Sequence, residues 1–205
     1  MKPKTMLLIP ALLALFAGEA SGAGGSVEVM GGQANTTLDV KLSGEVAPRT
    51  GIFVRNRTTV DYNNQVSPFT LADLTFNIAG GLDAVAEVQM APGMGAVPRL
   101  GVQYFKAFGD FSVYGLATGK ARENPNAEMI VLLRYMPRLS ERIKGFAQVE
   151  ALSDIGRTGH EYSTQRIRLG LDISGYRLGA AADLVETGNK AAMSYNMGGF
   201  VSKNF

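Results

Sequence analysis

The chain contains no cysteine and no tryptophan, and it has a single histidine. The lack of cysteine excludes a disulfide framework, a thiolate metal site and a lipid anchor on an amino-terminal cysteine. A dominant charge is also lacking, because 20 Lys and Arg are balanced by 18 Asp and Glu for a net charge of +2. The basic residues are dispersed, so nucleic acid is not an expected partner. No group of His or carboxylates has the spacing of metal ligands, and we expect neither a metal nor a cofactor.

Long apolar runs are lacking beyond residue 25, so we expect no transmembrane helix there. The apolar run from Met6 to Ala17 follows Lys2 and Lys4 and precedes small residues, which is the layout of a secretory signal. This run is too short to span a bilayer, which takes about 20 residues, and Pro10 interrupts it. We therefore predict a signal peptide over residues 1–23, cleaved after Ala20, Gly22 or Ala23, and one domain over 24–205; an uncleaved anchor is the alternative.

The dominant pattern in the rest of the chain is alternation of apolar and polar residues, interrupted by clusters of Gly, Pro, Asn and Asp. Leu38 and Val40, for example, alternate with Asp39 and Lys41, which predicts a strand with one apolar and one polar face. Residues 127–136 and 178–186 are rich in helix-forming residues, but the same alternation favours strands there. The predicted strands are 26–34, 37–46, 51–61, 69–78, 82–90, 99–108, 111–118, 128–136, 143–152, 164–174, 175–186 and 191–205, of which the first is weak because it depends on Val27 and Val29.

The predicted connections alternate in length after the third strand. The longer ones are 62–68, 91–98, 119–127 and 153–163, and the shorter ones are 79–81, 109–110, 137–142 and 174–175. Outer-membrane barrels have this asymmetry, with long loops outside the cell and tight turns on the periplasmic side. The sequence therefore predicts an all-β fold, an antiparallel up-and-down transmembrane β-barrel of about 12 strands, with about 10 as the alternative.

Charged residues fall almost entirely on one face of the predicted strands. An Arg or Lys that faces lipid near the midplane costs about 2–4 kcal/mol, so a membrane barrel must turn this face inward. The exceptions, Lys106, Glu186 and Lys203, lie near strand ends, where a long side chain reaches the headgroups. A soluble barrel would have the reverse arrangement, and alternation alone does not distinguish the two.

Aromatic residues favour the membrane barrel. Six of them lie on the apolar face at the short-turn end of their strands, which indicates an interfacial girdle. They are Phe76, Phe108, Phe111, Tyr135, Tyr176 and Phe205.

The last segment, AAMSYNMGGFVSKNF, alternates and ends on Phe205. It resembles the closing strand of bacterial outer-membrane proteins, although Lys203 places a charge where an apolar residue is common. The resemblance implies a bacterial outer-membrane location, contact with lipid and lipopolysaccharide, and reading of the terminal strand by the barrel-assembly machinery. In size and in its inward arginines, the chain is also similar to small twelve-stranded porins for acidic oligosaccharides.

The leading functional hypothesis is a passive pore for small hydrophilic solutes. The pore-lining candidates are Arg55, Arg57, Arg134, Arg166, Arg168, Arg177, Asp73, Glu87 and Glu150. The same arginines could instead pair with inward carboxylates and hold the barrel in shape. The alternatives for the whole protein are therefore a closed structural or adhesive barrel, and a soluble periplasmic β-protein that binds an apolar ligand.

We expect no enzyme and no catalytic residues. His160 lies in the predicted loop 153–163 near Glu161 and Ser163, but the spacing matches no hydrolase motif, and a lone loop histidine is usually solvated.

Overall fold

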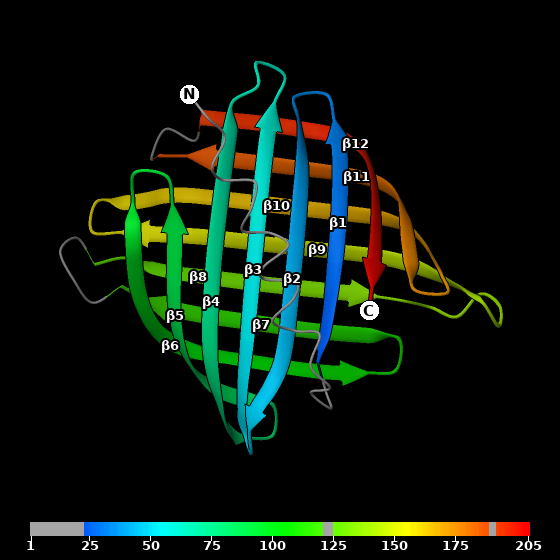
Figure 1. Ribbon diagram of the computed structural model, residues 1–205, viewed down its shortest axis with the longest axis horizontal. Coiled ribbons are helices and arrows are strands. Elements are labelled where there is room, and N and C mark those ends of the chain that lie inside the picture. The colour runs from blue at the N-terminus through cyan, green and yellow to red at the C-terminus, as the bar shows by residue number, and fades with distance from the viewer. Residues whose placement is uncertain (1–22, 121–124, 189–191) are drawn as a thin grey trace.

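The computed structural model describes residues 23–120, 125–188 and 192–205, so residues 1–22 of the predicted signal peptide lie outside the described part. The described residues form a closed antiparallel barrel (Figure 1). Its strands are β1 (Gly24–Gly32), β2 (Asn35–Ala47), β3 (Thr50–Asp61), β4 (Val66–Ala79), β5 (Leu82–Ala91), β6 (Gly95–Phe108), β7 (Phe111–Gly119), β8 (Ala127–Tyr135), β9 (Ile143–Gly156), β10 (Gly159–Ile173), β11 (Tyr176–Thr187) and β12 (Ala192–Asn204).

Within the described ranges, no helix is long and apolar enough to cross a membrane.

Each strand pairs with its neighbours in sequence, and β1 closes the barrel against β12. Met30 lies opposite Phe200 in this seam, and the backbones of Gly25 and Phe205 exchange two hydrogen bonds of 2.8 and 3.0 Å. The prediction of an up-and-down barrel with twelve strands is confirmed, including its weak first strand. Residues 127–135 and 178–186 are in strands, as the alternation predicts.

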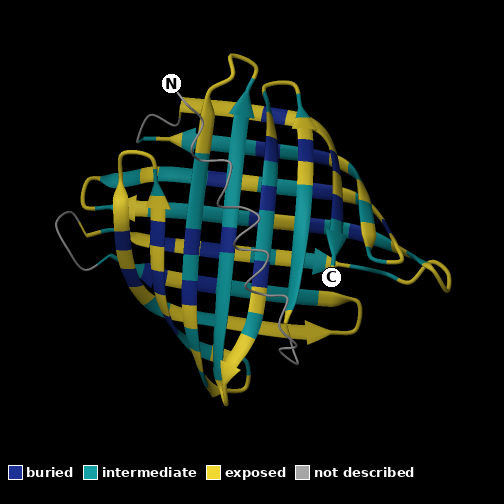
Figure 2. Ribbon diagram, viewed as in Figure 1, coloured by how far each residue is buried: buried dark blue, intermediate teal, exposed yellow. Residues whose placement is uncertain are grey.

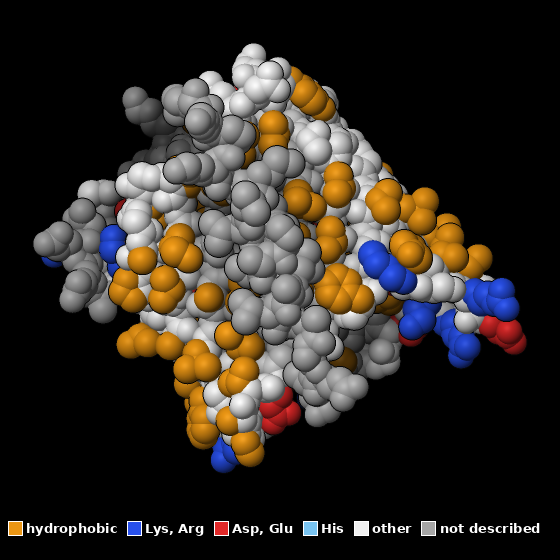
Figure 3. Space-filling model, viewed as in Figure 1, with side chains coloured by type: hydrophobic (Ala, Val, Ile, Leu, Met, Phe, Trp, Pro, Cys, Tyr) orange, Lys and Arg blue, Asp and Glu red, His pale blue; other side chains and the backbone are white. Residues whose placement is uncertain are grey.

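The two faces of the barrel wall differ in composition. Buried residues recur along the middle of the strands and alternate with exposed ones (Figure 2). The exposed positions carry large apolar side chains, such as Leu100 at 67 % exposure, whereas charged residues such as Asp73 and Glu87 are buried in the lumen. Hydrophobic side chains are spread over the outer face that Figure 3 shows. This is the arrangement of a barrel in lipid and the reverse of what the soluble alternative requires.

The predicted aromatic residues all lie on the outer surface. They occupy the end of the barrel where β1 begins and β12 ends, which we call the terminal end; the opposite end is the loop end. Phe111 stacks on Phe108 and Tyr135 at centroid distances of 6.0 and 4.2 Å, and Lys203 lies 3.8 Å from the ring centre of Tyr176. The predicted ring of aromatics is therefore present, and the charge of Lys203 lies beside one of its members.

The predicted difference in connection length is wrong in part. Strands continue into segments that the sequence pattern assigns to long loops: β9 ends at Gly156 and β10 begins at Gly159, so the predicted loop 153–163 is a tight hairpin. The predicted loop 91–98 shrinks to 92–94 in the same way, and 136–142 at the terminal end is as long as 120–126 at the loop end. The physical reason is that inward polar residues at the strand ends look like loop residues in the sequence.

Candidate functional site: the lumen of the barrel

The inner wall carries the polar half of each alternating strand. All nine predicted pore-lining residues are on inward-facing positions, because each strand keeps its register with both neighbours over these residues. Strands far apart in the sequence therefore project charges into one space. The contacts among these charges determine how much of the lumen remains open.

Arg55 on β3 links two walls of the barrel. Its Nε and Nη2 donate to the carboxylate of Asp39 on β2 at 2.9 and 2.6 Å, and its Nη1 donates to Glu150 on β9 at 3.1 Å. Glu150 also pairs with Arg166 on β10, and the ammonium of Lys41 lies 4.0 Å from its other oxygen. A single carboxylate thus holds cations that come from β2, β3 and β10.

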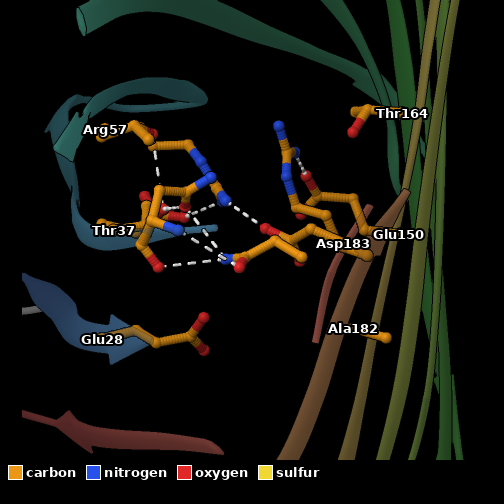
Figure 4. Close-up of polar contacts among 12 residues, drawn as sticks. Glu28, Thr37, Arg57, Glu150, Thr164, Ala182 and Asp183 are labelled. Atoms are coloured by element: carbon orange, nitrogen blue, oxygen red, sulfur yellow. Dashed lines mark hydrogen bonds and ion pairs between the residues drawn. The ribbon is translucent and has the colours of Figure 1, made fainter. Parts of the chain in front are cut away.

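A second chain of ion pairs crosses the lumen beside the first. Arg57 on β3 donates to Asp183 on β11 at 2.5 Å, and Asp183 accepts from Arg168 on β10 at 2.7 Å. Arg168 also donates to Glu28 on β1 at 2.9 Å. In Figure 4, Arg57 extends from one wall towards Asp183 and Glu150 on the other. We call the two chains together the central cluster: Glu28, Asp39, Lys41, Arg55, Arg57, Glu150, Arg166, Arg168 and Asp183.

The central cluster lies between two cavities. One, of about 600 Å³, lies towards the terminal end and is lined by residues that include Lys41, Arg55 and Arg134. The other, of about 370 Å³, lies towards the loop end and is lined by residues that include Arg57 and Asp183. Two cavities therefore lie on opposite sides of a charged cluster in the lumen.

An acidic group connects the wall formed by β4 and β5 with β8. Asp73 and Glu87 face each other across the β4–β5 pair, and Gln89 donates to both Glu87 and Glu128 at 2.8 and 2.9 Å. Arg99 on β6 lies 3.5 Å from Glu87. The side chains of this group extend the contacts across the lumen, since β5 and β8 are not neighbours in the sheet.

The remaining two predicted arginines form hydrogen bonds with side chains on the adjacent strand rather than across the lumen. Arg134 donates to Gln148 at 3.0 Å, and Arg177 donates to Asp172 at 3.0 Å while lying over the ring of Phe146. Neither is part of the central cluster. The candidates are therefore brought together in part: Arg55, Arg57, Arg166, Arg168 and Glu150 meet, while Asp73 and Glu87 form the separate acidic group.

Sequence reasoning alone misses several residues of the lumen. Arg99 escapes notice because the predicted strand begins at that residue, although β6 begins at Gly95 and Arg99 alternates with Pro98 and Leu100. Glu28 lies in the weak first strand, where its position between Val27 and Val29 is a usable signal. Inward apolar residues escape as well, because a hydrophobic residue on the inner face cannot be recognised by its type; those in the cluster near the β1–β12 seam are Met30, Phe146, Ala181 and Phe200.

Among the described residues, no group of three or more His, Cys, Asp or Glu is arranged to hold a metal ion.

Comparison with solved structures identifies known barrels that this fold resembles. A KdgM porin in complex with disordered oligogalacturonate matches with a TM-score of 0.53 and 9 % identity, over 89 % of this chain and 99 % of that chain. A KdgM porin alone matches with a TM-score of 0.52 and 12 % identity, over the same shares. The fold is that of a twelve-stranded outer-membrane β-barrel.

LpxR from Salmonella typhimurium is also similar, at a TM-score of 0.47 and 7 % identity over 88 % of this chain and 99 % of that chain. No protein-family model matches the sequence. No curated protein matches it either.

Proposed function

We propose that the protein is a narrow outer-membrane pore for small hydrophilic solutes, with the central cluster as its constriction. The observation that supports this is the pair of cavities, of about 600 and 370 Å³, on the two sides of the cluster. A barrel of twelve strands falls between the filled interior of eight strands and the open channel of sixteen. A pore of this class selects solutes by the charged side chains at its narrowest point.

The central cluster favours anions weakly. It contains five cations and four anions, so its net charge is +1. Oligogalacturonate, with which one of the similar porins is in complex, is an acidic oligosaccharide, and this agrees with the sign of the cluster. The preference stays weak, because each arginine of the cluster already faces a carboxylate.

Planar-bilayer recordings test the pore and its selectivity together. We expect stepwise currents and a reversal potential in a KCl gradient that indicates a small preference for Cl⁻. Arg57 and Asp183 form a matched pair for mutation, since both variants break the same 2.5 Å contact. Asp183→Asn raises the net charge of the cluster and should increase the anion preference, whereas Arg57→Gln lowers it and should move the preference towards cations. Equal shifts in the two variants would contradict the assignment of the constriction.

A closed structural barrel is the second candidate, supported by the ion pairs that cross the lumen between β3 and β9 and between β3 and β11. It predicts no stepwise current from the wild-type protein. Current that appears only after Arg55→Ala would support a barrel held shut by these pairs and would exclude the passive pore.

The outer-membrane location and the predicted partners are part of the same proposal. The apolar outer wall with its aromatic ring suits a lipid bilayer with lipopolysaccharide in its outer leaflet, and the terminal strand suits the barrel-assembly machinery. Heat-modifiable migration on a gel, together with fractionation into the outer membrane, tests this. Recovery in a detergent-free soluble fraction would contradict it.

A further inference from the structure

An irregularity in β10 brings two reactive side chains to the outer wall. Residues three apart in a regular strand point to opposite faces. The register of β10 against β9 shifts at Glu161, so that His160 pairs with Ile155 and Ser163 pairs with Ser153. Ile155 belongs to the outward-facing set and is 49 % exposed. The bulge therefore places His160 and Ser163 together on the outer face, and bulges often re-aim side chains in this way at active sites.

The hydrogen bonds indicate which ring nitrogen of the neutral His160 carries the proton. His160 Nδ1 lies 3.1 Å from the carbonyl oxygen of Gly188, and its Nε2 lies 2.6 Å from Ser163 Oγ. A carbonyl oxygen only accepts, so Nδ1 carries the proton of the neutral ring and Nε2 is free to accept from the Ser163 hydroxyl. Ser153 Oγ, 3.0 Å from Ser163 Oγ, then donates to it.

This geometry is that of an activated nucleophile. A serine hydroxyl donates to a histidine nitrogen, and a third group orients the histidine. Here that third group is a backbone carbonyl, that of Gly188, rather than a carboxylate. Glu161, the bulged residue, accepts a hydrogen bond from Asn126 at 3.4 Å, on another strand connection.

The pair is accessible, and apolar side chains lie one strand beyond its direct neighbours, which are Glu186 on β11 and Ser153 on β9. Ser163 and His160 are only partly buried. Met129, which is paired with Ser153, is 54 % exposed, and Met193, on the far side of Glu186 from Ser163, is 64 % exposed. The pair lies near the loop end of the barrel, so a molecule held against the wall by its acyl chain would bring its ester group towards Ser163.

We propose that His160 and Ser163 form a hydrolytic site on the outer wall for carboxylic esters with apolar acyl chains. His160 Nε2 takes the proton as Ser163 Oγ bonds to the ester carbonyl carbon. The tetrahedral intermediate breaks its bond to the alkoxy oxygen, which receives that proton from His160 and leaves as the alcohol. Water then attacks the acyl-serine, with His160 again as base, and releases the carboxylic acid and free Ser163. Ser153 is a positioning residue that orients the nucleophile.

Covalent labelling of the protein in detergent micelles with a fluorophosphonate tests the nucleophile. We expect the label on Ser163, located by mass spectrometry, and none in Ser163→Ala. His160→Gln should slow labelling by about 100-fold, at the low end of what a general base contributes. Ser140→Ala, in the 136–142 connection at the opposite end, is the control and should label at the wild-type rate. A wild-type protein that labels no faster than Ser163→Ala, or labels at another serine, would overturn the proposal.

Insertion of one alanine between Asp154 and Ile155 on β9, opposite Glu161, supplies a variant that keeps all the reactive residues. Glu161 then has a partner and the strand pair is regular, so His160 should turn to the lumen side while Ser163 stays outside, and labelling should fall as far as in His160→Gln. Heat-modifiable migration shows whether each variant is folded. Labelling that survives in a folded insertion variant would refute the role of the bulge and of His160.

Hydrolysis assays define the substrate. We expect release of nitrophenol from nitrophenyl esters in micelles, faster for long than for short acyl chains, and release of fatty acid from phospholipid vesicles that contain the protein. Cleavage of short soluble esters alone would reject an acyl-chain site. The site is separate from the lumen, so Ser163→Ala should conduct like the wild type, and loss of the pore would leave this proposal intact.

Discussion

At the scale of single residues, the lumen depends on pairs of charges rather than on individual ones. Arg55 illustrates this, because it binds Asp39 and Glu150 at once and its side chain is mostly buried. A buried ion pair contributes little net stability when intact, but removal of one partner leaves a charge without compensation. The arginines of the central cluster therefore affect both the width of the lumen and the stability of the barrel.

Arg55→Ala should lower the free energy of unfolding by about 3 kcal/mol, because Asp39 and Glu150 each lose a buried partner. Urea unfolding in lipid vesicles measures the change, followed by circular dichroism because the chain has no tryptophan to report by fluorescence. Arg157→Ala, at an exposed hairpin position, is the control and should change stability by less than about 0.5 kcal/mol. Equal effects of the two variants would contradict the role of the cluster.

At the scale of elements, glycine allows the backbones of neighbouring strands to approach closely. A Cβ on Gly101 of β6 would lie 1.9 Å from the carbonyl oxygen of Ala117 on β7, so the two backbones must separate to accept any side chain. Gly31 of β1 has no atom within 4 Å of the corresponding position. The two glycines are in similar strands but in different surroundings.

Gly101→Ala should therefore destabilise the barrel by about 1–3 kcal/mol, the usual cost of overpacking, and reduce the refolded fraction. Gly31→Ala should refold as well as the wild type. The folded fraction is read from heat-modifiable migration after refolding into vesicles. A normal yield of folded Gly101→Ala would show that the β6–β7 pair can separate without cost.

The strand elements themselves were largely predictable. Leu38, Asp39, Val40 and Lys41 alternate because the wall has one face in lipid and one in the lumen, and this physical difference applies along each strand. The ends of strands were not predictable to the same degree, since polar residues such as Asp154 suit both a lumen-facing position and a loop. Helix propensity in 178–186 was overridden by pairing on both sides of β11.

At the scale of the whole molecule, closure leaves no free strand edge in the described barrel. The seam joins the first and last strands, and its outermost hydrogen bonds link Gly25 and Phe205. A closed wall is what allows a sheet to satisfy its backbone groups in lipid. The stability of the barrel therefore depends on contacts between opposite ends of the chain.

Deletion of Phe205 should remove both terminal hydrogen bonds of the seam and one aromatic of the terminal ring, and we expect less folded protein in the outer membrane of expressing cells. Phe205→Tyr keeps the backbone bonds and an aromatic ring, so it should assemble normally. Quantitative blotting of heat-modifiable protein in membrane fractions measures both. Wild-type assembly of the deletion variant would argue against recognition of the terminal strand.

The alternation of residue types is a local property, and it specifies the strands and which residues share a face. Together with the position of the aromatics at one end of the strands, it indicates that the charged face turns inward. The partners of those charges are not local. Arg57 and Asp183 are separated by 126 positions in the chain and meet only because closure brings β3 and β11 across one lumen. The contact of His160 with Ser163 likewise depends on a one-residue shift in register, which arises from pairing with β9 and leaves no mark in the pattern of residue types.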